Sequence, residues 1–168
     1  MSPGLRGRWK MIVENLLLLA TILLGGLGIW FYSPWLSLLY FGFAGVVHLF
    51  VLRKLICINC IHFKDGCHIG WNRIAFALFS KGSIENFEER MNKIGAPIWI
   101  VTFIWPIIAL ARTLITSFSV SLAFITVFYL LLVIASLFSL GKLGCSNCEM
   151  SKKCLIGKIC PVKSVKRR

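Results

Sequence analysis

Four stretches of the chain are long and apolar enough to cross the hydrocarbon core of a bilayer, which takes roughly 17–25 helical residues. Hydrophobic residues make up 58% of the sequence and the mean hydropathy is +0.82, whereas soluble domains are roughly 45–50% apolar. The sequence therefore predicts an all-α integral membrane protein with four transmembrane helices, at about Met11–Phe31, Pro34–Leu52, Pro97–Phe118 and Ser119–Leu140.

The predicted spans form two pairs with very short connections. Only Tyr32 and Ser33 separate the first two spans, and a few residues near 116–121 separate the last two. Such connections join antiparallel neighbours, so each pair is predicted to be a helical hairpin. Glycines of the first hairpin are expected to let helix backbones approach closely, and they are Gly25, Gly26, Gly28, Gly42 and Gly45.

Basic residues lie almost entirely on one side of the predicted spans. The chain has 19 Lys and Arg against 6 Asp and Glu, a formal net charge of +13. Apart from Arg112, the basic residues precede the first span, lie between the second and third, or follow the fourth. The positive-inside rule then predicts a multi-pass protein of the cell membrane with both termini and the central loop in the cytoplasm. The charge is explained by membrane orientation, so we expect no nucleic-acid partner.

A cysteine motif follows each hairpin. Lys54-Leu-Ile-Cys57-Ile-Asn-Cys60 reappears as Lys142-Leu-Gly-Cys145-Ser-Asn-Cys148, and each copy continues to a third cysteine, Cys67 or Cys154. We infer a tandem duplication whose two copies enter the bilayer in the same direction, a parallel repeat. The predicted units are a first repeat over 1–70, an amphipathic cytoplasmic loop over 71–96 and a second repeat over 97–168. Both cysteine motifs then face the cytoplasm.

The central loop carries apolar residues at helical spacing. Those of its first half, predicted to form one face of an interfacial helix, are Trp71, Ile74, Ala75, Leu78 and Phe79. Ser83 is predicted to cap a second short helix, which Gly95 and Pro97 end before the third span begins.

The cysteines are expected to bind metal. A CxxC turn lets two thiolates hold one ion, and a third cysteine and a fourth ligand close the site. The first copy offers His68 or His62 as the fourth ligand, and the second offers Cys160. Two separate sites and one shared site are both consistent with the spacing. The predicted metal ligands are Cys57, Cys60, Cys67, His68, Cys145, Cys148, Cys154 and Cys160.

Zinc and an iron–sulfur cluster are the two candidate cofactors. Mixed thiolate and imidazole ligation is typical of structural zinc. Pro161 after Cys160 is a feature of ferredoxin-type cluster ligands, although the compact C-x2-C-x2-C-x3-C-P run is absent. A thiol redox protein is a further alternative, which the predicted cytoplasmic placement disfavours because disulfides there are normally transient.

His48 is the one histidine inside a predicted span, and an ionisable group there is a candidate functional residue. It is expected to receive protons, contact a quinone head group or pass a metal, unless it is simply bonded to a helix carbonyl. Arg112 is expected near the opposite membrane interface.

The spans and cysteine motifs together predict an anchoring, assembly or electron-transfer component of a membrane complex. The arrangement resembles that of membrane-anchored ferredoxin-like subunits of quinol-oxidising complexes, although its motifs depart from theirs. No catalytic triad, P-loop or dinucleotide fingerprint is present in the sequence, which favours a non-enzymatic role. The alternatives are a soft-metal transporter or metal chaperone, and a lipid-surface binding module with a basic tail. The expected partners are the lipid bilayer and other subunits of a membrane complex.

Overall fold

The computed structural model describes residues 5–63 and 70–140, which form helices and no strand. Four helical stretches are long and apolar enough to span a membrane, namely Trp9–Tyr32, Pro34–Asn59, Asn86–Thr116 and Val120–Ser139. A helix satisfies its own backbone polar groups, which lipid cannot do. The prediction of an all-α, multi-pass membrane protein is therefore confirmed at this level.

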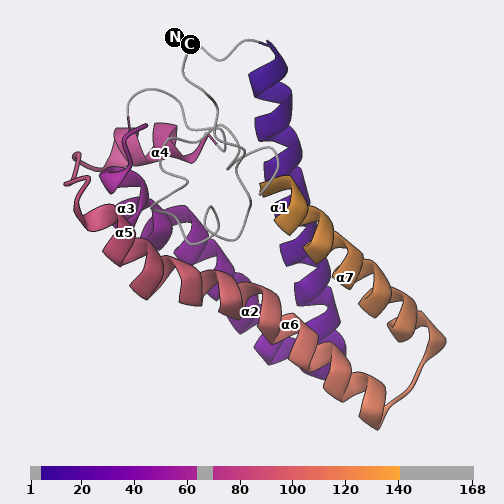
Figure 1. Cartoon of the computed structure of the whole chain (residues 1–168). Coiled ribbons are helices and arrows are strands. Elements are labelled where there is room, and N and C mark those ends of the chain that lie inside the picture. The colour runs from indigo at the N-terminus through magenta and orange to yellow at the C-terminus, as the bar shows by residue number, and fades with distance from the viewer. Residues whose placement is uncertain (1–4, 64–69, 141–168) are drawn as a thin grey trace.

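Two of these four stretches consist of more than one type of helix, and Figure 1 labels the α-helices. In chain order the elements are α1 (Leu5–Tyr32), α2 (Pro34–Val46), the π-helical segment η1 (Val47–Val51), α3 (Leu52–Leu55), the short 3-10 helix η2 (Cys57–Asn59), α4 (Trp71–Leu78), α5 (Asn86–Arg90), the π-helical segment η3 (Met91–Gly95), α6 (Ala96–Thr116) and α7 (Val120–Ser139).

The helix α1 is the centre of the bundle. It packs against α2, α6 and α7, and α6 also packs against α7 (Figure 1). The turn between α1 and α2 is the single residue Ser33, whose backbone is extended (φ −161°, ψ 121°). Pro34 explains this break, because a residue before proline avoids the helical region and proline itself fits the first turn of a helix.

The described elements that carry the candidate functional residues lie at one end of the bundle. The start of α1, the η2 turn, α4, α5, the start of α6 and the end of α7 lie there, and we call it the motif end (Figure 1). The turns at Ser33 and at 117–119 form the opposite end. Arg112, predicted near that opposite interface, is exposed, and its guanidinium lies 5.8 Å from the ring centre of Tyr32.

The predicted break before the third span is wrong. The chain is helical from Asn86 to Thr116, because η3 connects α5 to α6 without interruption. Pro97 has no N–H to donate, and the wider turn of the preceding π-helical segment accommodates it at the start of α6. The predicted N-cap is also absent, since Ser83 precedes α5 by several residues and Glu85 takes the position before its first residue, without a side-chain cap.

The glycine prediction holds on α1 and fails on α2. A Cβ at Gly25 would meet Pro106 at 2.9 Å, and one at Gly28 would meet Leu110 at 2.7 Å. A Cβ at Gly42 or Gly45 would meet nothing within 4 Å. The close packing of α1 against α6 therefore depends on the α1 glycines Gly25 and Gly28, whereas the α2 glycines face open space.

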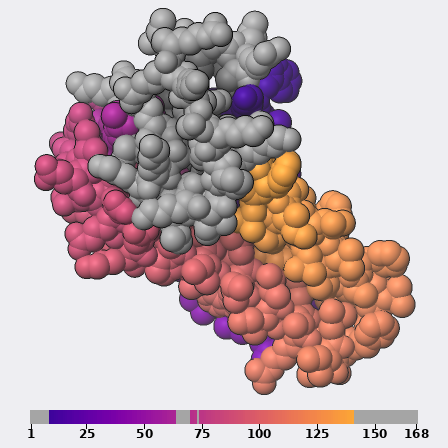
Figure 2. All heavy atoms as spheres, in the orientation of Figure 1, coloured from indigo at the N-terminus to yellow at the C-terminus, as the bar shows by residue number. Residues whose placement is uncertain are grey.

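The outer surface of the bundle is apolar. In the space-filling view, α6 and α7 form a continuous outer face over the lower part of the molecule (Figure 2). Most of the large apolar side chains of α7 are exposed, and they are Val120, Phe124, Val127, Phe128, Leu130, Leu131, Ile134, Leu137 and Phe138. Such a face suits contact with lipid tails.

The loop between the second and third spans contains α4, whose apolar residues are only partly covered. Ala75 is fully buried and Trp71 is half-buried, whereas Ile74 and Leu78 are exposed. The predicted face is therefore split between the bundle and the outside. Its contact with the membrane surface, and the duplication of the hairpins, stay predictions.

Candidate functional site

The first cysteine pair lies in a tight turn at the end of the second span. Cys57 opens the 3-10 helix η2, and the amide of Cys60 donates a hydrogen bond to the carbonyl of Cys57 at 3.3 Å. Both cysteines are half-buried. The side chain of Asn59, which is 1% exposed, donates to the carbonyl of Leu55 at 2.7 Å and so fixes the turn to the helix end.

Two neighbouring segments brace this turn from outside. The amide of Gly82 donates to the carbonyl of Ile58 at 2.9 Å. The side-chain amide of Asn72, on α4, donates to the carbonyl of His62 at 2.8 Å. The cysteine pair is therefore presented on a fixed backbone, because the residues before, within and after it are all hydrogen-bonded.

Most of the predicted metal ligands lie outside the described residues. These are Cys67, His68, Cys145, Cys148, Cys154 and Cys160. Over 5–63 and 70–140, no group of three or more histidine, cysteine or acidic side chains is placed to hold a metal ion. The described part thus contains one cysteine pair of the predicted site, and the prediction that the other ligands join it stays untested.

A buried arginine lies one helical turn before the cysteine pair. Arg53 is 4% exposed, and its guanidinium donates to the carbonyl of His48 at 3.2 Å and to that of Trp71 at 3.3 Å. The same group lies 5.3 Å from the ring centre of Trp71, a favourable cation–π distance. Cys57 follows Arg53 by about one helical turn along the chain. Arg53 therefore brings a fixed positive charge to the cysteine turn.

His48 lies on the π-helical segment η1 and is 5% exposed. Its Nδ1 is 3.0 Å from the carbonyl of Ala44, so Nδ1 carries the proton and donates it. Its Nε2 keeps a lone pair and has no hydrogen-bond partner within the described residues. π-helical turns inside α-helices occur frequently at functional sites. His48 is thus bonded to a carbonyl of its own helix, and its second nitrogen is left available as an acceptor.

Two tryptophans form the wall beside His48. The rings of Trp71 and Trp99 are nearly parallel, with an angle of 7° and centres 6.1 Å apart. The imidazole of His48 lies edge-on to both, with its centre 5.1 Å from that of Trp99. The ring of Trp99 also stacks on Phe103 of the same helix. This aromatic cluster connects α4 to the start of α6.

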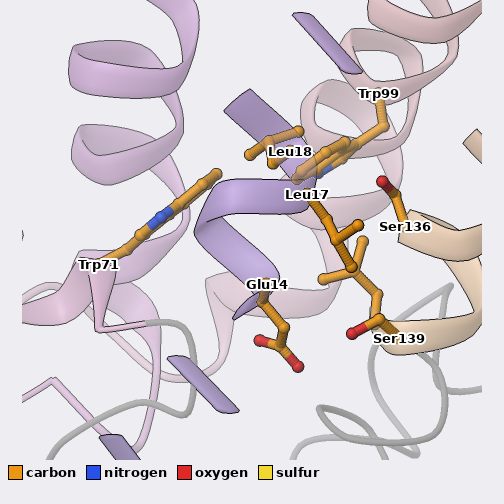
Figure 3. Close-up of a pocket in the computed structure, with 8 residues that line it drawn as sticks. Glu14, Leu17, Leu18, Trp71, Trp99, Ser136 and Ser139 are labelled. Carbon is orange, nitrogen blue, oxygen red and sulfur yellow. The ribbon is translucent and has the colours of Figure 1, made fainter. Parts of the chain in front are cut away.

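Trp71 and Trp99 also line a small cavity, to which α1 contributes Glu14 and α7 contributes Ser136 and Ser139 (Figure 3). Three leucines complete its wall, Leu17, Leu18 and Leu140. The volume within which the centre of a water molecule can lie is about 10 Å³, so the cavity has room for about one water. Glu14 is 5% exposed, and both of its carboxylate oxygens lack a hydrogen-bond partner in the described part of the chain.

The sequence pointed to His48 and the cysteines but not to the residues that surround them. Glu14 is the only acidic residue inside the predicted spans, and that signal could have identified it. Arg53 has no such signal, because at the end of a span it is indistinguishable from a residue that merely sets topology. The roles of Trp71 and Trp99 depend on packing between segments that are distant in sequence.

Comparisons with known proteins give no match to this chain, whether by family model, by curated protein or by solved structure.

Proposed function

We propose that the chain is a membrane-anchored metal protein in which Cys57 and Cys60 supply two thiolate ligands of a zinc or iron–sulfur site. The supporting observation is the braced turn that presents this pair at the end of a span. A CxxC turn on a fixed backbone holds two thiolates at little further entropic cost. The helices of the bundle then serve to hold the site at the membrane.

The remaining ligands are assigned from the sequence. Cys67 with His68 or His62 completes a site in the first copy, and the second copy supplies four cysteines, Cys145, Cys148, Cys154 and Cys160. A shared site would instead combine the two CxxC pairs. In either arrangement the charge pattern places the metal on the cytoplasmic side, where it serves an anchoring, assembly or electron-transfer role in a membrane complex.

The position of Arg53 favours a permanently bound metal at the cysteines over a path for metal transport. Metal centres with three or four thiolates carry negative charge, so a fixed guanidinium one turn away stabilises them. A soft-metal transporter would have to pass cations between Cys57 and His48. Arg53 lies between these two residues on the same helical stretch and bonds to the backbone of His48, so its positive charge opposes such a path.

The test is to purify the whole chain anaerobically in mild detergent and measure zinc, iron and sulfide per chain together with the visible spectrum. We expect bound metal, colourless if it is zinc and broadly absorbing if it is a cluster. Cys57→Ser should lose that metal wholly if the site is shared and in part if two sites exist. Ile61→Ser, at an exposed position in the same loop, is the matched control and should keep it.

Two results would contradict the proposal. One is wild-type protein that contains no stoichiometric metal when purified without oxygen. The other is a Cys57→Ser variant that keeps the full metal content of the Ile61→Ser control. Cys145→Ser then separates the two arrangements, because a shared site loses all its metal with either cysteine variant.

A further inference from the structure

Pro106 lies in the middle of α6 and interrupts its hydrogen bonding. Proline has no N–H, so the carbonyl four residues earlier, that of Thr102, loses the donor that a helix would otherwise give it. Water cannot replace this donor in the interior of a membrane, and an unpaired carbonyl there is costly. Another group must therefore bond to Thr102 if α6 is to continue through the proline as one helix.

Tyr40 supplies the missing donor from another helix. Its hydroxyl, on α2, donates a hydrogen bond to the carbonyl of Thr102 at 3.1 Å. The side chain is fully buried, and its ring lies edge-on to that of Trp105, with the ring centres 5.9 Å apart. The carbonyl that Pro106 deprives of its helix donor is thus bonded to the first hairpin.

Tyr129, on α7, makes a similar bond one residue further along α6. Its hydroxyl donates to the carbonyl of Phe103, also at 3.1 Å, and its side chain is also fully buried. Phe103 differs from Thr102 because the residue four positions after it, Ile107, has an N–H to donate. A carbonyl has two lone pairs. The tyrosine bond to Phe103 is therefore a second bond, whereas the tyrosine bond to Thr102 replaces a lost one.

The ring of Pro106 packs against the bare backbone of α1. A Cβ at Gly25 would lie 2.9 Å from this ring, so the helix beside the proline is one that leaves it room. A proline inside a helix is also the place where the helix bends most easily. Pro106 divides α6 into a half that carries Trp99 at the motif end and a half that carries Arg112 toward the opposite end (Figure 1).

We propose that Pro106 is a hinge in α6 and that the Tyr40 hydroxyl is the latch that holds this hinge closed. While Tyr40 bonds to the freed carbonyl, α6 is one continuous helix, and Trp99 stays against His48. When that bond breaks, the half of α6 that carries Trp99 is able to turn about Pro106, and the aromatic cluster beside His48 changes with it. This inference does not depend on the metal proposal for the cysteines.

The test is a double-mutant cycle between Tyr40 and Pro106, measured by denaturant titration of the whole chain in detergent. Tyr40→Phe keeps the ring but leaves the Thr102 carbonyl unpaired, so the equilibrium constant for folding should fall about tenfold. In a Pro106→Ala background the restored N–H pairs that carbonyl, and the same change should cost no more than about threefold. Tyr129→Phe is the matched control, and its cost should be the same with proline or alanine at position 106.

Hydrogen–deuterium exchange measures the hinge itself and needs no change at Pro106. The amides of residues 107–110, in the turn after the proline, should exchange at least about fivefold faster in Tyr40→Phe than in the wild type or in Tyr129→Phe. Equal costs of Tyr40→Phe with proline and with alanine at position 106 would overturn the latch. Exchange in Tyr40→Phe that equals that of the wild type or of Tyr129→Phe would overturn the hinge, even if Pro106→Ala does not fold.

Discussion

The indole nitrogen of Trp71 donates a hydrogen bond to the side-chain oxygen of Asn15 at 2.8 Å. The two residues are far apart in sequence, one on α4 in the loop and the other on α1. This bond joins α4 to the start of the first span, and the Trp71 ring that it holds lies against Arg53 and also lines the cavity beside Glu14. It therefore links the loop that follows the first cysteine pair to the first span.

Asn15→Leu should loosen this connection. It leaves the Trp71 N–H without its acceptor and also removes the bond from the Asn15 amide to the carbonyl of Met11. We expect a loss of about 1 kcal/mol in the free energy of unfolding, measured by denaturant titration in detergent. Asn92→Leu, at an exposed position, should leave stability nearly unchanged. A loss equal to that of the control would show that α4 is not held by this bond.

Replacement of glycine by alanine should distinguish the two helices of the first hairpin. The Cβ of Gly25→Ala would collide with the rings of Pro106 and Tyr129, at 2.9 and 3.0 Å, and neither ring can move freely in a packed helix interface. A cost of about 1–3 kcal/mol is expected in thermal or denaturant unfolding. Gly42→Ala meets no neighbour and should be neutral or stabilise the helix by up to about 1 kcal/mol. The reverse order would contradict the packing of α1 against α6.

Arg53→Lys keeps the charge but not the planar guanidinium that bonds to two carbonyls and lies against Trp71. Because these are buried bonds to a charged group, we expect a loss of about 2 kcal/mol in the free energy of unfolding. Lys54→Arg, at the exposed neighbouring position, should have no comparable effect. Arg53→Gln should in addition speed the release of metal to a chelator, since the thiolates lose a positive charge. An unchanged rate of metal release in Arg53→Gln would show that Arg53 does not stabilise the metal site.

The side of the membrane on which the motifs lie can be measured by thiol labelling in intact cells. A membrane-impermeant maleimide should not label the wild type from outside, because all seven cysteines belong to the motifs that the charge pattern predicts to lie in the cytoplasm. Ser117→Cys, in the turn between α6 and α7, should be labelled. Outside labelling of the wild type, with Ser117→Cys adding nothing, would reverse the orientation and favour the thiol redox alternative.

Hydropathy was sufficient to predict the four spans, because each must present an apolar surface along its whole length. It did not predict how their ends continue. The second span extends through η1 and α3 to Asn59, and the third begins at Asn86, before the proline expected to open it. Gly95 and Pro97 break an isolated helix by their own preferences, but a π-helical segment packed in a bundle overrides them.

The candidate functional residues likewise include some that the sequence predicts and others that depend on packing. The CxxC pair and His48 were visible in sequence because their residue types and positions are unusual. The burial of Glu14 was not, since a carboxylate near the start of a span is expected to reach water at the membrane surface. Trp71 and α7 cover it, and those contacts join segments that are distant in sequence.

X-ray absorption at the edge of the bound metal is the most direct test of the central claim, that the cysteines hold a metal at the membrane. In the whole chain purified anaerobically, we predict sulfur neighbours around the metal, at about 2.3 Å if it is zinc. Their number should fall in Cys57→Ser. A metal surrounded only by nitrogen and oxygen at about 2.0–2.2 Å would contradict the account.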